Sequence, residues 1–272
     1  LTYMAGIAAK RLSGKPLVVH VHATSFDRSS DQNIDTRVYE IEKRGMEAAD
    51  KVITVSDLTR NIVITKYGID PAKVVTVHNA VDFSGRSDMK VERGVKDKVV
   101  TFLGRITFQK GPEYFIEAAA KVLKRCDNVR FVMAGSGDMM NRSIRQVARL
   151  GISDRFHFTG FLRGSEVQKM FALSDVYVMP SVSEPFGISP LEAMRTGVPS
   201  VISRQSGAAE VLKYAFKVDF WDVDAMADQI YALLKYPALS DFASKYGYDE
   251  VNTLKWNNAT AKIKKVYESV IK

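Results

Sequence analysis

Two glutamates lie close together in the segment SVSEPFGISPLEAMRTGVP. Glu184 precedes a glycine turn and Glu192 follows it, with seven residues between them. Ser189, Pro190 and Glu192 have the order of a helix start, with Ser at the N-cap, Pro at the first helical position and Glu at the third. The preceding run DVYVMPS is typical of a strand. Because a helix N-terminus presents unpaired backbone N–H groups, this strand, loop and helix predict a phosphate-binding turn.

Two cations follow another strand-like run, in FLGRITFQKG. Arg105 and Lys110 stand between the apolar run VVTFLG and a predicted helix that begins at Pro112, and Gly104 makes the turn flexible. Ligands of open parallel sheets bind outside the carboxyl ends of the strands. The sequence therefore predicts that Arg105 and Lys110 face an anion, each through a charge-assisted hydrogen bond that contributes about 1.5–3 kcal/mol.

Glycines also follow two further strand-like runs. Gly135 ends the run VRFVMAG and Gly137 follows it, and both let a backbone approach a ligand closely. Met140 occupies the position of the third glycine of a dinucleotide fingerprint, which argues against NAD. Phe161 and Leu162 follow RFHFTG and either border a ligand or belong to the core.

Strand-like and helical runs alternate along almost the whole chain, which predicts parallel sheets covered by helices. The fold class expected is α/β with two Rossmann-like domains. The first part contains only about three strand-like runs, whereas a doubly wound domain usually has five or six. We therefore expect the first domain to be incomplete, with its beginning absent from this chain.

The expected division follows these runs and a polar, glycine-containing stretch between them. Residues 1–83 are the later portion of an acceptor-side domain, 84–98 a linker, 99–255 a complete donor-binding domain, and 256–272 a lysine-rich helix. The lysine-rich helix is expected to pack back toward the first domain.

Composition sets broad limits. The 272 residues carry a formal charge of +8, which favours phosphorylated molecules, anionic membrane surfaces or simply a solvated basic surface. A single cysteine excludes an internal disulfide and suits a reducing compartment. No apolar run approaches the roughly 18 residues of a membrane span, and no secretory signal is visible, so a cytoplasmic location is expected.

The paired glutamates also support a family resemblance. Glu184 is followed by PFG, and Glu192 begins EAM…G.P. This pattern resembles the motif of retaining glycosyltransferases of family 4, which are also called glycosyl transferases group 1 and include glycogen synthase-like enzymes. The resemblance implies the two-domain fold GT-B and a nucleoside-diphosphate sugar, most readily a UDP- or ADP-sugar, as donor. It implies transfer to a carbohydrate or other hydroxyl acceptor with retention of anomeric configuration.

The resemblance also implies roles for individual residues. Arg105 and Lys110 hold the donor diphosphate, Glu192 binds the ribose hydroxyls, Glu184 faces the donor sugar, and His22 reaches the sugar hydroxyls from the first domain. The predicted catalytic residues are Glu184, His22, Arg105 and Lys110. The predicted donor-binding residues are Gly104, Arg105, Lys110, Gly135, Gly137, Phe161, Leu162, Glu184, Phe186, Gly187, Ile188 and Glu192. With its first domain incomplete, the chain is expected to bind a nucleoside diphosphate but to transfer sugar poorly.

No metal or cofactor is expected. His20 and His22 share one face of a strand but lack a third ligand of convincing spacing. Asp222 and Asp224 spell the Asp-x-Asp of metal-dependent glycosyltransferases, yet their position before a helical run favours helix initiation. The resembled fold handles its diphosphate with cations and helix dipoles.

Three alternatives stay open on sequence alone. The chain could be a nucleotide-sugar epimerase, a phosphorylase on a similar scaffold, or a nucleotide-binding fragment without catalysis. Nucleic acid is not expected as a partner, because the basic residues are scattered rather than clustered with aromatics.

Overall fold

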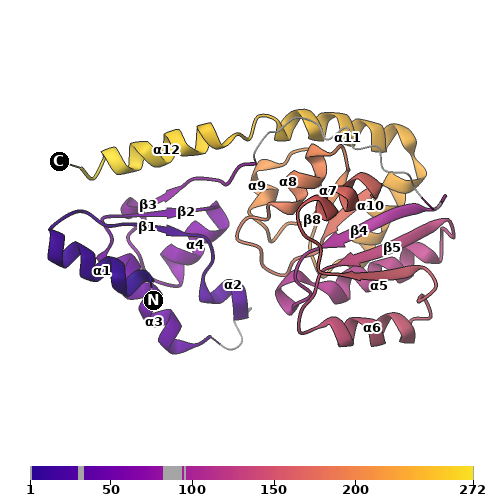
Figure 1. Ribbon diagram of the computed structural model, residues 1–272, viewed down its shortest axis with the longest axis horizontal. Coiled ribbons are helices and arrows are strands. Elements are labelled where there is room, and N and C mark those ends of the chain that lie inside the picture. Colours follow the sequence, from indigo (N-terminus) through magenta and orange to yellow (C-terminus); the bar gives the residue numbers. More distant parts are fainter. Residues whose placement is uncertain (1, 30–33, 82–93, 95, 272) are drawn as a thin grey trace. The chain divides into compact units, whose positions relative to one another are not determined.

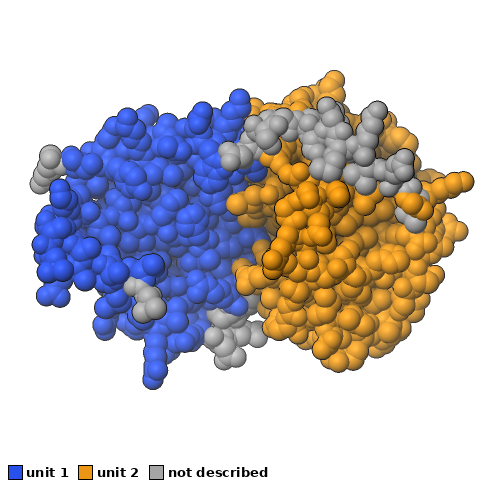
Figure 2. Space-filling view, viewed as in Figure 1, with its two compact units in different colours: residues 1–82, 183–186, 254–272 blue, residues 83–182, 187–253 orange. Residues whose placement is uncertain are grey.

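The computed structural model describes residues 2–29, 34–81, 94 and 96–271, and Figure 1 shows its helices and strands. The chain divides into two units, which are coloured separately in Figure 2. Unit 1 contains residues 1–82, 183–186 and 254–272, and unit 2 contains residues 83–182 and 187–253. Each unit is an α/β structure with a parallel sheet, which confirms the predicted fold class.

Unit 1 contains a parallel sheet in the order β1-β2-β3. Its strands are β1 (Val18–Val21), β2 (Lys51–Thr54) and β3 (Val74–Thr76). Its helices are α1 (Thr2–Ser13), α2 (Ser25–Ser29), α3 (Thr36–Ala48), α4 (Asp57–Thr65) and α12 (Trp256–Glu268), with the 3-10 turn η1 (Pro71–Lys73) before β3. Their positions follow the apolar periodicity of the sequence.

The sheet of unit 1 has a core on each face because alternate strand residues point to opposite sides. Val19 and Val52 pack on one face with Met46 of α3 and with residues of α1 and α4. Ile53 packs on the other face with Val266 of α12. Helix α12 therefore covers the sheet face opposite α3, and burial of the Val266 side chain there contributes about 1.5–3 kcal/mol.

Unit 2 contains a second, larger parallel sheet. Its strands are β4 (Lys98–Leu103), β5 (Val129–Ala134), β6 (Phe156–Gly160), β7 (Val176–Met179), β8 (Ser200–Ser203) and β9 (Phe216–Val218). Its helices are α5 (Pro112–Leu123), α6 (Met140–Arg149), α7 (Ser165–Leu173), α8 (Ser189–Arg195), α9 (Ala208–Val211), α10 (Val223–Lys235) and α11 (Pro237–Val251), with the 3-10 turn η2 (Phe108–Lys110) before α5. Phe115 of α5, Val147 of α6 and Ile230 of α10 join the core on one face, whereas Met170 of α7 packs on the other.

The strand order of this sheet is β6-β5-β4-β7-β8-β9. The chain moves outward from β4 to β6, returns, and continues from β7 in the opposite direction, as in a doubly wound fold. The direction reverses between β4 and β7, which are paired directly. In such sheets, ligands bind outside the carboxyl ends of the strands at this switch point. The loops that follow β4 and β7 are therefore expected to form the site.

The polar sequence ATSFDRSSDQN has the composition of a loop, yet Ser25–Ser29 within it form helix α2. Asp27 reaches back to Thr24 and accepts hydrogen bonds from its backbone N–H (2.7 Å) and its hydroxyl (2.8 Å). These two bonds to the residue before the helix stabilise a helical turn that the polar composition does not predict.

The expected division of the chain differs from the structure at three places. Residues 84–93 and 95 of the expected linker lie outside the described residues. The last two linker residues belong to unit 2, where Asp97 makes an ion pair with Arg130 of β5 and Lys98 begins β4. Residues 183–186, expected in the second domain, group with unit 1. Leu254 also groups with unit 1, because its carbonyl accepts a hydrogen bond from the Val81 N–H.

Candidate functional site

The loop after β4 holds Arg105 between two fixed neighbours. The Gly104 N–H donates to the Ala134 carbonyl at 3.0 Å, and the Ile106 N–H donates to the Ser136 carbonyl at 2.9 Å. Ile106 is fully buried, whereas Arg105 is exposed and makes no ion pair with any residue that the structure describes. An unpaired guanidinium at the switch point is available to an anion.

Lys110 ends the turn η2, close to the loop that follows β7. The carbonyl of its neighbour Gln109 accepts a hydrogen bond from the Val182 N–H at 2.9 Å. Gly111 comes next in a left-handed conformation, and a Cβ there would lie 2.1 Å from the Pro180 carbonyl oxygen. The backbone at Lys110 is therefore held against the exit from β7, next to the switch point.

Gly135 and Gly137 follow β5, as the sequence predicted, and the structure gives a reason for each. A Cβ on Gly135 would lie 1.8 Å from the Gly104 carbonyl oxygen, and one on Gly137 would lie 2.2 Å from the Ile106 carbonyl oxygen. The close approach that these glycines permit is between the loop after β5 and the loop after β4. They therefore fix the backbone on both sides of Arg105.

Phe161 and Leu162, which follow β6, differ in their surroundings. Leu162 packs partly against the core under α7. The Phe161 side chain is 61% exposed, with the Arg163 guanidinium 5.3 Å from the centre of its ring. The core interpretation of Phe161 is thus wrong, and an exposed ring beside the carboxyl end of β6 can stack on a planar group.

Glu192 of α8 lines a cavity of about 370 Å³ between α7 and α8. The other lining residues are Leu103, Gly164, Val167, Gln168, Phe171, Arg195 and Thr196. Burial raises the pKa of the Glu192 carboxyl, and the Arg195 charge partly opposes this shift. A half-buried carboxylate gains from hydrogen-bond donors on a ligand, and hydroxyl groups are suitable donors.

The start of α8 differs from its prediction. Ser189 was expected to cap the helix with its side chain, but it is the first helical residue and makes no such bond. Its hydroxyl instead accepts a hydrogen bond from the Tyr177 hydroxyl of β7 at 2.7 Å. Gly187 takes a left-handed φ of 92°, and the next side chain, Ile188, is 42% exposed.

The remaining predicted residues belong to unit 1. His22 directly follows β1 and is exposed. Glu184 is 7% exposed, and Phe186 is buried with its ring centre 6.2 Å from that of His78. The structure thus assigns His22, Glu184 and Phe186 to one unit, and Gly104, Arg105, Lys110, Gly135, Gly137, Phe161, Leu162, Gly187, Ile188 and Glu192 to the other.

His20 lies two residues before His22, and their ring centres are 4.3 Å apart. The His20 Nε2 atom is buried and has no hydrogen-bond partner among the described residues. Burial lowers the pKa of His20 to about 4 from an ordinary 6.5, and the neighbouring His22 adds to the shift. His20 is therefore uncharged at neutral pH.

We expect this histidine to make folding sensitive to acid. The unfolded chain takes up the His20 proton at a higher pH than the folded chain, so stability is retained above pH 6.5 and is lost as the pH falls toward 4. Because solvent screens this partly buried ring, the expected loss between pH 7 and pH 5 is about 1 kcal/mol. Urea unfolding of the wild type and of His20→Phe at both pH values measures it, with His157→Gln as a matched control. Equal pH dependence in the wild type and His20→Phe would contradict the prediction.

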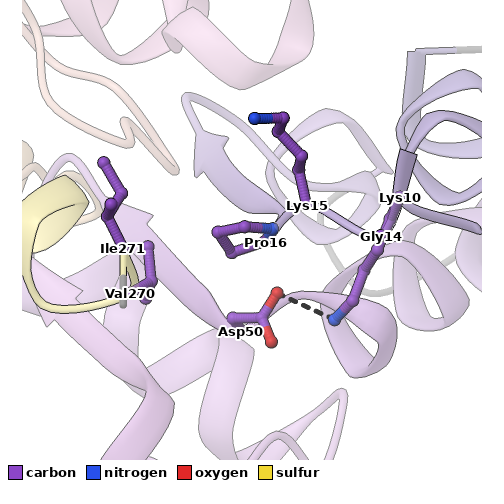
Figure 3. A pocket seen from close by; sticks show the side chains of 7 residues that line it. All are labelled: Lys10, Gly14, Lys15, Pro16, Asp50, Val270 and Ile271. Atoms are coloured by element: carbon purple, nitrogen blue, oxygen red, sulfur yellow. Dashed lines mark hydrogen bonds and ion pairs between the residues drawn. The ribbon is translucent and has the colours of Figure 1, made fainter.

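Sequence reasoning missed the α7 side of the Glu192 cavity. Val167, Gln168 and Phe171 line it from a helix that carries no motif. Their spacing of three and four residues places them on one helix face, and this was the only available signal. A different cavity, of about 630 Å³, lies at the amino end of β1 and β2, where Lys10 pairs with Asp50 (Figure 3). None of the predicted residues lines it.

Comparison with known proteins identifies the family. The model for Glycosyl transferases group 1 matches residues 86–250. The chain belongs to this family. The model for Glycosyltransferase Family 4 matches residues 1–84. The predicted resemblance to the family 4 enzymes is therefore confirmed.

Relatives and solved structures agree with this group 1 glycosyltransferase assignment. An uncharacterized glycosyltransferase of Methanocaldococcus jannaschii is 33% identical over 79% of this chain and 58% of its own length. The UDP-Gal:alpha-D-GlcNAc-diphosphoundecaprenol alpha-1,3-galactosyltransferase of Escherichia coli is 25% identical over 99% of this chain and 73% of its own length. The structure of Anabaena HepE in complex with UDP and glucose matches with a TM-score of 0.84 and 21% identity, over 98% of this chain and 75% of that one. The likeness confirms the predicted GT-B fold.

Every helix among the described residues is too short or too polar to span a membrane.

Proposed function

We propose that the protein transfers a sugar from a nucleoside-diphosphate sugar to a hydroxyl acceptor, with retention of anomeric configuration. The observation that carries the proposal is the position of Arg105, exposed and without an ion pair among the described residues, at the switch point of the unit 2 sheet. Lys110 and Glu192 lie on the loops and helix that adjoin this point. Cations for a diphosphate and a carboxylate for ribose hydroxyls suit such a donor.

The proposed chemistry depends on stabilising a leaving group. As the bond between the sugar and the phosphate breaks, negative charge develops on the nucleoside diphosphate. Arg105 and Lys110 bind this charge more strongly in the transition state than in the bound donor, which accelerates departure. The family resemblance supports attack by the acceptor on the same face of the sugar, with the departing phosphate as base and without a protein nucleophile.

The donor and acceptor are proposed at the level of chemical class. The HepE structure holds UDP, and the name of the Escherichia coli relative gives a UDP-sugar, so a uridine donor is favoured and an ADP-sugar is the alternative. The same name gives a lipid-linked diphosphate as acceptor. Together with the formal charge of +8, this supports a peripheral membrane contact as part of the proposal.

A thermal-shift screen tests the donor directly. We expect UDP and UDP-sugars, or ADP and its sugars, to raise the unfolding midpoint more than GDP at equal concentration, because only the folded state binds them. Incubation with the preferred donor and a panel of alcohols, followed by NMR of the product anomers, tests retention. An inverted anomer would reject the retaining mechanism, and no shift with any nucleotide would reject the function.

The two glutamates are expected to differ when each is replaced by glutamine. Glu192→Gln should weaken nucleoside diphosphate binding several-fold, because a neutral amide accepts ribose hydroxyls less strongly than a carboxylate. Glu184→Gln should leave that binding unchanged and lower the transfer rate or the added affinity of the sugar. Titration calorimetry with UDP and UDP-glucose separates the effects, with Glu166→Gln on the exposed start of α7 as control. If both variants only lower the melting temperature, the pair is structural.

A further inference from the structure

Two carboxylates are buried behind the turn that carries His22. Asp27 of α2 is 0% exposed and Glu42 of α3 is 4% exposed. Neither lies in the set predicted to bind the donor. A buried carboxylate is costly unless it is paired or well hydrogen-bonded. The bonds that each one makes therefore indicate what it holds in place.

Glu42 holds the first residue of α2. One oxygen, Oε2, accepts hydrogen bonds from the Ser25 N–H at 3.0 Å and the Ser25 hydroxyl at 2.8 Å. The Tyr67 hydroxyl donates to the same oxygen, and burial together with Glu42 raises the pKa of Tyr67. The Arg28 guanidinium lies 3.8 Å from the second oxygen. Charge-assisted bonds to both the backbone and the side chain of Ser25 fix the end of the turn that begins at His22.

Asp27 holds the middle of the same turn and a second segment. Its Oδ2 atom accepts from the backbone and hydroxyl of Thr24. Its Oδ1 atom accepts from the Ser183 hydroxyl at 3.0 Å. Ser183 directly precedes Glu184, and residues 183–186 belong to unit 1. One carboxylate thus contacts both the segment with His22 and the segment with Glu184.

A shared cavity connects this scaffold to His22. His22, Glu42 and Arg28 all line a space of about 390 Å³ beside β1, together with His20 and Tyr3. Only two residues, Ala23 and Thr24, separate His22 from Ser25. A change in the hydrogen bonds of Ser25 or Thr24 is therefore transmitted to His22 through a very short stretch of backbone.

We propose that Glu42 and Asp27 are positioning residues for sugar transfer, which fix His22 and Glu184 within unit 1. The proposal rests on the proposed function, because that function gives both residues their roles toward the donor sugar. It predicts that neutral replacements of the two acids affect the sugar and spare the nucleoside diphosphate. A purely structural role predicts only a loss of stability.

The first measurement compares the binding of UDP and UDP-glucose by calorimetry in Glu42→Gln and Asp27→Asn. We expect the affinity for UDP-glucose to fall about fivefold or more, while the affinity for UDP changes by less than about twofold. Asp50→Asn is the matched control, because Asp50 accepts from the Leu17 N–H at 2.7 Å and from Lys10 at the opposite end of β1. It should lower stability and leave the ratio of the two affinities unchanged.

The second measurement is a double-mutant cycle. If Glu42 acts through His22, Glu42→Gln should cause no further loss of UDP-glucose affinity in a His22→Ala background. Independent, additive losses would overturn the proposal.

The third measurement does not depend on any ligand. The imidazole signals of His22 in nitrogen-edited NMR spectra, assigned with His22→Gln, should shift in Glu42→Gln and in Asp27→Asn, whereas those of His157 should not. Unchanged His22 signals together with a lower melting temperature would overturn the proposal. If UDP fails to bind, the proposed uridine donor is rejected, while the NMR result still decides the role of the two acids.

Discussion

Replacing both Arg105 and Lys110 by alanine is expected to weaken nucleoside diphosphate binding at least about a hundredfold. Each side chain is proposed to make a charge-assisted hydrogen bond of about 1.5–3 kcal/mol, and two such losses correspond to a factor of roughly 10² to 10⁴. Arg105 is exposed, so its truncation should hardly affect folding. Calorimetric titration of UDP into the variant measures the affinity directly.

The matched control is the double variant Arg149→Ala and Lys235→Ala. It removes the same two charges from the ends of α6 and α10, which lie away from the switch point. A similar loss of affinity in this control would mean that the general charge of +8 attracts the nucleotide. Unchanged affinity in the site variant would remove Arg105 and Lys110 from the proposed function.

Gly135→Ala is expected to destabilise unit 2 by about 3 kcal/mol or more. The added Cβ would lie 1.8 Å from the Gly104 carbonyl oxygen, and the φ of 148° is unfavourable for alanine. Relief requires the loops after β4 and β5 to separate, and this breaks the hydrogen bond from Gly104 to Ala134. Urea unfolding, followed by far-ultraviolet circular dichroism, measures the loss.

Two glycines provide controls for this prediction. Gly104→Ala meets no atom within 4 Å and should be nearly neutral. Gly151 has a φ of 69° in open space, so Gly151→Ala reports the cost of the backbone conformation alone, about 1 kcal/mol. If Gly135→Ala lowers the free energy of unfolding no more than Gly151→Ala does, the loops after β4 and β5 separate at little cost and the prediction is wrong.

The order of elements could be predicted from the sequence, because each signal is local. The strand-like runs VVTFLG and VRFVMAG correspond to β4 and β5, and the helix predicted to begin at Pro112 is α5. The reading of Asp222 is also confirmed, since its carboxylate caps α10 by accepting from the Ala225 N–H. Alternation of such runs leaves few topologies other than a parallel sheet.

Features that depend on distant partners could not be predicted in this way. Ser189 has the sequence position of a helix cap, but its hydroxyl accepts a hydrogen bond from the distant Tyr177 hydroxyl. Phe161 is an aromatic residue of the kind found in protein cores, yet its ring is exposed, whereas the neighbouring Leu162 packs against the core. The Ser183 hydroxyl donates to Asp27, which lies 156 residues away in the sequence. Local periodicity does not predict a contact between such distant residues.

The membership of residues 183–186 and of α12 in unit 1 has a consequence for hybrid proteins. The backbone passes from one unit to the other after residues 82, 182, 186 and 253, so a single crossover in the gene near residue 83 does not exchange one unit alone. Such a crossover with a related gene also brings in a foreign equivalent of Ser183 and a foreign α12. The foreign residue at position 183 must then donate to Asp27, and the foreign helix must pack on the apolar surface around Ile53 and Val77. Both of these partners come from the other parent. Recombination between relatives is therefore expected to succeed mainly where these contacts are compatible, even when every residue at the donor site is shared.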